Sequence, residues 1–74
     1  MRATFTCESG VGELSRVFDT LRRMGIALVS IEARPKNDRM AVTIELEGGD
    51  DTLRKTFGHR LSLIAGVSEL RTCP

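Results

Sequence analysis

The chain alternates short strand-like segments with two longer amphipathic ones. In the first segment, Arg2 to Cys7, the apolar residues Ala3, Phe5 and Cys7 alternate with polar residues. A period of two with β-branched and aromatic residues is typical of a strand that buries one face. We therefore expect a first strand over Arg2 to Cys7.

A helical period follows the break at Ser9-Gly10-Val11-Gly12 and predicts a helix over residues 12–24. Its apolar residues recur at the spacing of one helical face and are Leu14, Val17, Phe18, Leu21 and Met24. Arg22 and Arg23 lie in the last turn, where positive charge suits the helix dipole. Gly25 is placed to end this helix in a left-handed conformation.

The middle of the chain has the pattern of a β-hairpin. Residues 26–33 are nearly continuously apolar and rich in β-branched side chains, which indicates a strand. Pro35-Lys36-Asn37-Asp38 supplies turn residues, and residues 40–47 then alternate apolar with polar. Two adjacent strands joined by this turn are expected.

A second amphipathic helix is predicted after Gly48-Gly49, with Asp50 or Asp51 as its N-cap. Its apolar face consists of Leu53, Phe57, Leu61 and Ile64. Gly66 ends the helical segment, and Val67 to Cys73 forms a short last strand. The mixed polarity of that strand is typical of a sheet edge or an interface.

The order strand, helix, strand, strand, helix, strand predicts an α+β, ferredoxin-like βαββαβ sandwich. Right-handed crossovers put both helices on one face of a four-stranded antiparallel sheet. We expect one domain over residues 1–74. A domain of this size has a thin core, and a second copy can cover apolar surface that one chain leaves exposed, so a homodimer is expected.

Charge and hydropathy exclude several classes of partner. The formal net charge is +1, which gives no field to attract nucleic acid or an anionic membrane. No apolar run approaches the roughly 20 residues that cross a bilayer, and the N-terminus has no signal-peptide core. We expect a cytoplasmic protein that binds neither nucleic acid nor membrane.

The two cysteines, Cys7 and Cys73, form no metal-binding motif. In the expected fold they lie at opposite ends of neighbouring antiparallel strands, about 20 Å apart at roughly 3.3 Å per residue. A disulfide needs Cα atoms within about 7 Å, so two free thiols are expected. We predict no metal site and no cofactor.

Several motifs resemble those of the ACT domain family of amino-acid-responsive regulatory modules. They are Gly12-Glu13-Leu14-Ser15-Arg16-Val17, Leu21, Gly25-Ile26 and Leu63-Ile64-Ala65-Gly66-Val67. Within that family, Glu8-Ser9-Gly10, Leu14 to Val17 and His59 to Val67 are most similar to the small regulatory subunits of acetolactate synthase. The chain length resembles their short, single-domain type.

The resemblance implies an effector amino acid at the interface of two domains, beside the loop between the first strand and first helix. The ligand-binding residues it implies are Ser9, Gly10, Val11, Gly12, Ile26 and Leu28. Amide groups at a helix N-terminus can receive a carboxylate, which gives this placement a physical basis. Ser9 and Val11 stand where related sequences carry asparagine and proline, a departure that argues against valine feedback. The resemblance to the short, single-domain type favours an activating partner over a sensor.

The resemblance therefore predicts a non-catalytic regulatory protein of branched-chain amino acid biosynthesis, with the catalytic subunit of acetolactate synthase as its partner. The alternative is a free-standing ACT domain that binds a small amino acid at a dimer interface. No catalytic residue is predicted, because His59 has no nucleophile at a motif spacing.

An RNA-binding module of the same topology is a weaker alternative. Such modules stack bases on aromatic residues of the first and third strands, and here only Phe5 is available. The cluster Arg34, Lys36 and Arg39 at the hairpin turn is interpreted as solvated surface charge, and Cys7 as a buried residue.

Overall fold

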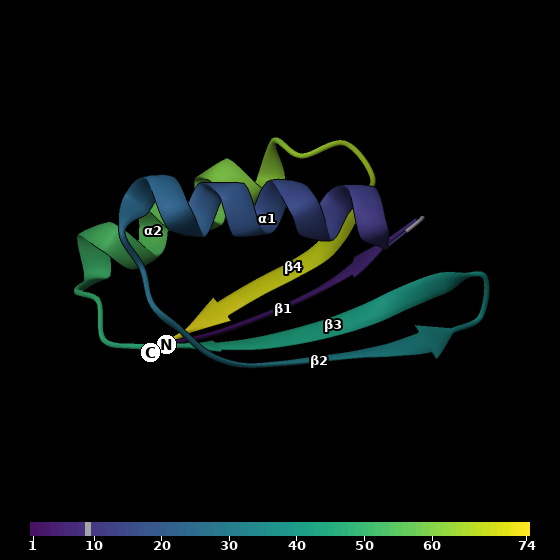
Figure 1. Ribbon diagram of the computed structural model, residues 1–74, viewed down its shortest axis with the longest axis horizontal. Helices are drawn as coiled ribbons and strands as arrows, with labels where there is room; N and C mark the ends of the chain where they lie inside the picture. The colour runs from purple at the N-terminus through teal and green to yellow at the C-terminus, as the bar shows by residue number, and fades with distance from the viewer. Residues whose placement is uncertain (9) are drawn as a thin grey trace.

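The computed structural model describes residues 1–8 and 10–74. Its elements are β1 (Arg2–Cys7), α1 (Val11–Met24), β2 (Leu28–Lys36), β3 (Arg39–Leu46), α2 (Asp51–Ser62) and β4 (Val67–Cys73). The strands form one antiparallel sheet in the order β2-β3-β1-β4. Both helices lie on the same face of that sheet (Figure 1). The predicted ferredoxin-like βαββαβ fold is confirmed.

The core lies between the helices and the two inner strands. Every second residue of β1 and β3 points toward the helices, which is why the alternation in sequence is so regular. The fully buried side chains include Phe57 and Leu61 of α2, Val17 of α1, and Val42 and Ile44 of β3. The predicted core faces of the inner strands are therefore confirmed, and Phe57 and Leu61 of the predicted α2 face are in the core. Leu53 is only partly buried, and Ile64 lies beyond the end of α2.

Local signals at the helix ends also act as expected. Gly25 adopts the left-handed conformation with φ 69°, and its N–H donates to the Arg22 carbonyl at 3.2 Å. The Asp50 side chain accepts a hydrogen bond from the Leu53 N–H at 2.8 Å. Asp50 rather than Asp51 is thus the N-cap of α2.

The hairpin is longer than its sequence pattern indicates. Pro35 and Lys36, predicted as turn residues, are the last residues of β2, and only Asn37 and Asp38 lie in the turn. A proline lacks an N–H donor, but an edge strand can accommodate it where no ladder bond is needed. At its other end β2 begins at Leu28 instead of residue 26.

β2 is an edge strand, and all nine of its residues are exposed. The hairpin of β2 and β3 extends past the start of α1 along the long axis of the molecule (Figure 1). Ile31 and Ala33 are paired with Ile44 and Val42, so they point toward the helix side of the sheet. β2 therefore carries apolar side chains on the core side without being covered.

The two cysteines are free, as predicted. Cys7 pairs with Val67 at the start of β4, whereas Cys73 pairs with Arg2 at the other end of the ladder. Among the described residues, neither helix is both long and apolar enough to cross a membrane.

Gly66, between α2 and β4, is required by the fold. Its φ of 91° is unfavourable for any residue with a side chain, and a Cβ there would come within 2.1 Å of the Glu13 carboxylate oxygen Oε2. We expect Gly66→Ala to lower the free energy of unfolding by about 2 kcal/mol, measured by urea denaturation.

Gly58→Ala is the matched control for this substitution. Gly58 lies inside α2, and a Cβ there would make an ordinary contact at 3.5 Å with Thr72. Because alanine favours a helix over glycine by up to about 1 kcal/mol, this variant should be unchanged or more stable. Equal stability of Gly66→Ala and the parent protein would contradict the argument.

Candidate functional site

The loop before α1 contains a glycine that packing requires. Gly10 is buried, has φ 87° and is the N-cap of α1. A Cβ at this position would lie 2.4 Å from the Met40 methyl carbon. The role of Gly10 is therefore to let the chain pass close to β3, and Ser9, also predicted to bind ligand, lies outside the described residues.

Val11 and Gly12 are the exposed part of this loop. They form the first turn of α1, and Val11 is 80% exposed. Amide groups in the first turn of a helix have no intrahelical acceptor, because the first intrahelical bond here runs from the Leu14 N–H to the Gly10 carbonyl. Glu13, on the same turn, is buried against Gly66. The exposed amides thus offer a place for a carboxylate on the outer side.

The other predicted ligand residues lie at the far end of α1. Ile26 is in the core, and Leu28 begins β2 and is partly exposed. Because α1 has fourteen residues, the loop at its start and the residues after its end are separated by about 20 Å. One chain does not bring the two groups together.

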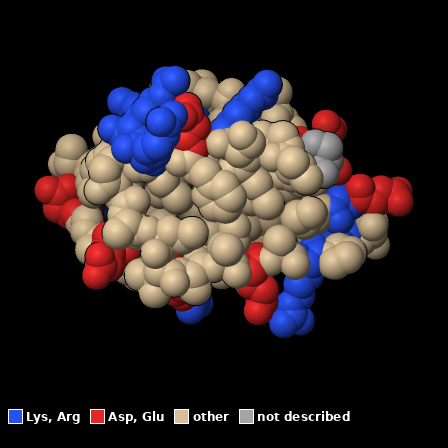
Figure 2. Space-filling view, viewed as in Figure 1, with Lys and Arg blue, Asp and Glu red and all other residues tan. Residues whose placement is uncertain are grey.

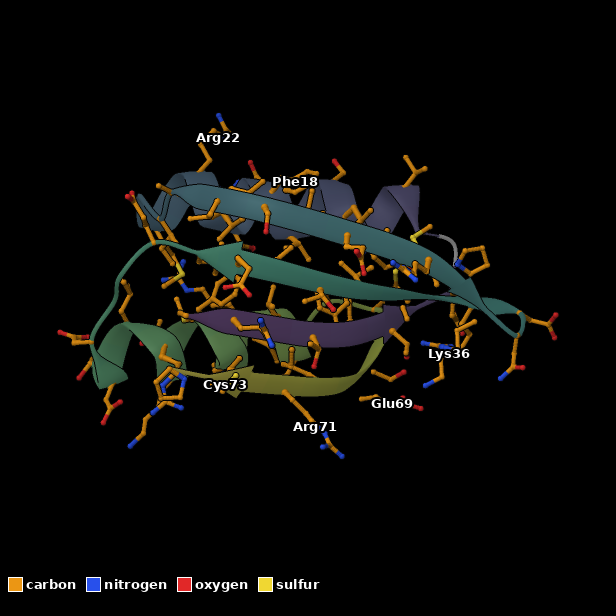
Figure 3. The ribbon with its side chains drawn as sticks, turned by 90° about the horizontal axis from the view of Figure 1, so that it is seen from below. Phe18, Arg22, Lys36, Glu69, Arg71 and Cys73 are labelled. Atoms are coloured by element: carbon orange, nitrogen blue, oxygen red, sulfur yellow. The ribbon has the colours of Figure 1, made fainter. Side chains whose placement is uncertain are left out.

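An apolar surface extends from α1 to β2 along one side of the molecule. Val11, Leu14, Ser15 and Phe18 line a shallow groove of about 360 Å³ on α1. Figure 2 shows an uncharged central band on this face, with charged side chains toward its ends. Phe18 is 40% exposed and lies on α1, which is seen behind β2 in Figure 3.

The exposed apolar residues of β2 continue this surface. Val29 is 63% exposed, and Leu28 and Ile31 are also classed as exposed. We define the α1–β2 surface as the set Val11, Leu14, Phe18, Leu28, Val29 and Ile31. The sequence pattern had placed Phe18 on the core face of α1, whereas the core uses only the narrower stripe that contains Val17 and Leu21.

The sheet face opposite the helices is polar. Its floor consists of Thr4, Thr6, Ala41 and Thr43, and it forms an open groove of about 470 Å³. The Lys36 ammonium lies 3.7 Å from the Glu69 carboxylate across one end of the groove, while Arg71 points outward (Figure 3). Glu69 has φ 54° at a β-bulge, where β4 has one more residue than β1.

The basic cluster of the hairpin is engaged in contacts within the chain. The Arg39 guanidinium donates to the Gly66 carbonyl at 3.0 Å and to the Ser68 hydroxyl at 2.8 Å. Arg34 forms an ion pair with Glu32 at 3.1 Å. Arg39 therefore joins the start of β3 to the start of β4, so its interpretation as solvated surface charge was wrong, whereas Arg34 and Lys36 are exposed as expected.

The polar face offers no stacking platform for RNA. Phe5, the one aromatic residue in the strands, points into the core and is almost fully buried. Base stacking needs an exposed aromatic ring, so the RNA-binding alternative loses the single residue that supported it.

The titratable residues considered in the sequence lie apart from one another. His59 is exposed on α2. Burial, together with the nearby Glu13 carboxylate, raises the pKa of the Cys7 thiol. Within residues 1–8 and 10–74, no three histidine, cysteine or acidic side chains are grouped so that they could hold a metal ion.

Known structures share this fold. The ACT domain of GTP pyrophosphokinase from Chlorobium tepidum superposes with a TM-score of 0.78 at 11% identity, over 95% of this chain and 91% of that one. The C-terminal domain of the MgtC protein from Mycobacterium tuberculosis gives 0.78 at 19% identity, over 95% and 80%. An uncharacterised protein from Thermotoga maritima gives 0.74 at 16% identity, over 99% and 91%.

The similarity of this chain to known proteins lies in its structure and not in its sequence. No model of a known protein family matches the sequence, and no curated protein matches it either. The chain thus has the ferredoxin-like fold of ACT domains.

The placement of the cysteines predicts selective thiol reactivity. The thiolate is the reactive form, and Cys7 is fully buried with a raised pKa, whereas Cys73 is exposed. A maleimide added to the folded protein at neutral pH should modify Cys73 alone, as measured by mass spectrometry. Both residues should react in urea, and modification of Cys7 in the folded protein at a comparable rate would contradict this placement.

Proposed function

We propose that this chain is a non-catalytic regulatory domain of the ACT type, which acts by binding a partner through its α1–β2 surface. The observation that carries the proposal is the exposure of this surface. Val11, Phe18, Val29 and Ile31 would be expected in contact with another molecule, because contiguous apolar surface on a small protein marks interaction sites.

A second copy of the chain is the partner we propose first. β2 has free backbone groups along its outer edge, and such an edge pairs readily with another strand. Pairing two β2 strands antiparallel about a two-fold axis would extend the sheet across both copies. It would also cover the apolar residues of β2 and α1.

The same pairing would assemble the proposed effector site. α1 and β2 run in opposite directions (Figure 1), so the N-terminus of α1 lies toward the end of β2. In an antiparallel pair the early part of the partner's β2 comes toward that end. The loop at Val11 and Gly12 would thereby meet residues that a single chain holds about 20 Å away.

The ligand we propose at this site is a small amino acid, whose carboxylate would accept hydrogen bonds from the amides of the first turn of α1. The enzyme partner we propose is a catalytic subunit of the acetolactate synthase class. Its support is the similarity of the Glu8-Ser9-Gly10, Leu14 to Val17 and His59 to Val67 motifs to small subunits of that enzyme.

A thermal titration tests the proposal. The melting temperature is measured with valine, leucine, isoleucine and the other amino acids, since a ligand that binds only the folded state raises it. At one hundred times the dissociation constant the expected stabilisation is about 2.7 kcal/mol. A shift with one amino acid supports an effector sensor.

If none of the amino acids shifts the melting temperature, an acetolactate synthase catalytic subunit is assayed with and without the chain. Increased turnover supports the activating role. The proposed function is refuted if no amino acid raises the melting temperature and the chain also fails to increase the turnover of the catalytic subunit.

Gly12→Asp tests the position of the site. The added carboxylate would repel a ligand carboxylate at the first turn of α1, while aspartate near a helix N-terminus is compatible with the fold. For any amino acid that stabilises the parent protein, we expect at least a tenfold loss of affinity in this variant, measured by the same titration.

Thr52→Asp is the matched control, because Thr52 is exposed and is also the second residue of its helix. It adds the same charge at the equivalent position of α2 and should bind the amino acid normally. Undiminished binding by Gly12→Asp would place the site elsewhere.

A further inference from the structure

The polar face of the sheet carries a row of hydrogen-bond donors that crosses three strands. Thr4 of β1 is paired with Thr43 of β3 on one side and with Arg71 of β4 on the other. Residues paired across antiparallel strands have their side chains on the same face, with Cα atoms about 4.5–5.5 Å apart. The three side chains therefore lie in one line, and all three line the open groove on this face.

Other charged side chains of this face already have partners. Arg2 forms an ion pair with Glu45 at 2.7 Å, and Arg34 forms one with Glu32 at 3.1 Å. These four residues thus neutralise one another on either side of the row. They leave the charge of the groove to the residues that line it.

The donors of the row have no such partners. In the part of the chain that the structure describes, no ion pair or hydrogen bond engages the side chains of Thr4, Thr43 or Arg71. The hydroxyl of Thr6, on the same floor, is different because it accepts a hydrogen bond from the Arg39 guanidinium at 3.3 Å. Two hydroxyls and one guanidinium are therefore available to a ligand in the groove.

Lys36 reaches the same groove from the opposite edge of the sheet. Its ammonium group lies 3.7 Å from the Glu69 carboxylate, and both side chains are more than half exposed. Exposed ion pairs of this kind contribute little to stability, so the ammonium group can turn toward a bound anion at small cost. Two cations and one carboxylate line the groove, which gives it an excess of positive charge.

This set of donors fits a phosphate group better than a carboxylate. A phosphate group carries about −1.5 to −2 charges at pH 7 and has three terminal oxygens that point in different directions. A carboxylate has only two oxygens, which lie in one plane. Arginine binds phosphate through two parallel hydrogen bonds, and lysine binds it as a point charge.

Arg71 has to change its rotamer to take part. Its side chain points outward from β4 (Figure 3), although it contributes to the wall of the groove. Side-chain rotamer changes of this kind are common when a ligand or partner binds. The outward position is the expected one for an unpaired guanidinium in the absence of an anion.

The groove is larger than a single phosphate group. Its volume of about 470 Å³ is within the range of roughly 300–1,000 Å³ that is typical of small-molecule sites. Ala41, between the threonines of the floor, has a small side chain that leaves this space open. The size therefore favours a phosphate ester of a small molecule over free phosphate.

We infer that the polar face of the sheet is a further ligand site, which binds the phosphate group of a small molecule. Arg71 and Lys36 supply the positive charge, and Thr4 and Thr43 supply hydroxyl donors. This inference goes beyond the proposed function, because the site lies across the sheet from the helices and uses no residue of the α1–β2 surface.

An NMR titration of the ¹⁵N-labelled protein tests the site. The probes are glycerol 3-phosphate and inorganic phosphate, each exchanged against sodium chloride at constant ionic strength. The amide signals of Thr4, Thr43 and Arg71 should shift and saturate, whereas the amide of Gly12 at the start of α1 should not move. Tighter binding of the ester would identify a phosphorylated small molecule as the ligand, and equal binding would identify free phosphate.

Charge variants give an independent measurement. Arg71→Gln should weaken binding of the ester about tenfold, because it removes a charge-assisted donor. Arg60→Gln removes the same charge from an exposed residue of α2 and is the matched control, which should bind like the parent protein. Glu69→Gln should instead strengthen binding severalfold, because it frees Lys36 and removes the competing carboxylate.

Three outcomes would overturn the inference. They are the absence of a saturable shift at the residues of the row, equal affinities of Arg71→Gln and Arg60→Gln, and displacement of the ester by acetate as effective as that by phosphate. None of them bears on amino-acid binding at Gly12, which the thermal titration measures separately. The phosphate site and the proposed function can therefore fail independently.

Discussion

The position of β1 between β3 and β4 is the constraint on which the rest of this structure depends. Its helix-facing residues Ala3, Phe5 and Cys7 are all buried, and both of its edges are paired. The helices must cover this strand and its neighbours to remove their apolar side chains from water, which is the main favourable term in folding. β2, at the edge of the sheet, receives the least cover. The exposure of its apolar residues follows from the topology.

The packing of the chain as a whole is ordinary for its size. Its accessible surface is 4730 Å², close to the roughly 4500 Å² expected for a folded monomer of this mass. The total exposed area is therefore normal, and the exposed apolar residues on the α1–β2 side do not result from loose packing. The opposite edge is different, because β4 contacts α2. Both edge strands carry charged residues and a register shift, which protect an edge against pairing, but β2 in addition exposes the apolar residues Val29 and Ile31.

The sequence predicted the elements well because their signals are local. Alternation placed Phe5, Val42 and Ile44 in the core, and Gly25 and Asp50 mark helix ends through their own backbone and side-chain chemistry. The hairpin length was missed because Pro35 is a strong turn signal whose strand role depends on lying at an edge. Phe18 was assigned to the core for a related reason. A helical period shows which residues share a face but not how wide a stripe the rest of the fold can cover.

The site was harder to predict, since its parts depend on contacts distant in sequence. A short glycine pair before a helix suggests a ligand loop, yet Gly10 is explained by its left-handed backbone and the close approach of Met40. This leaves Val11 and Gly12 as the exposed residues of the described loop. The residues proposed to complete the site lie beyond the other end of a fourteen-residue helix. If an effector binds here, two copies of the chain have to supply its contacts, and effector binding and dimerisation must then be thermodynamically coupled.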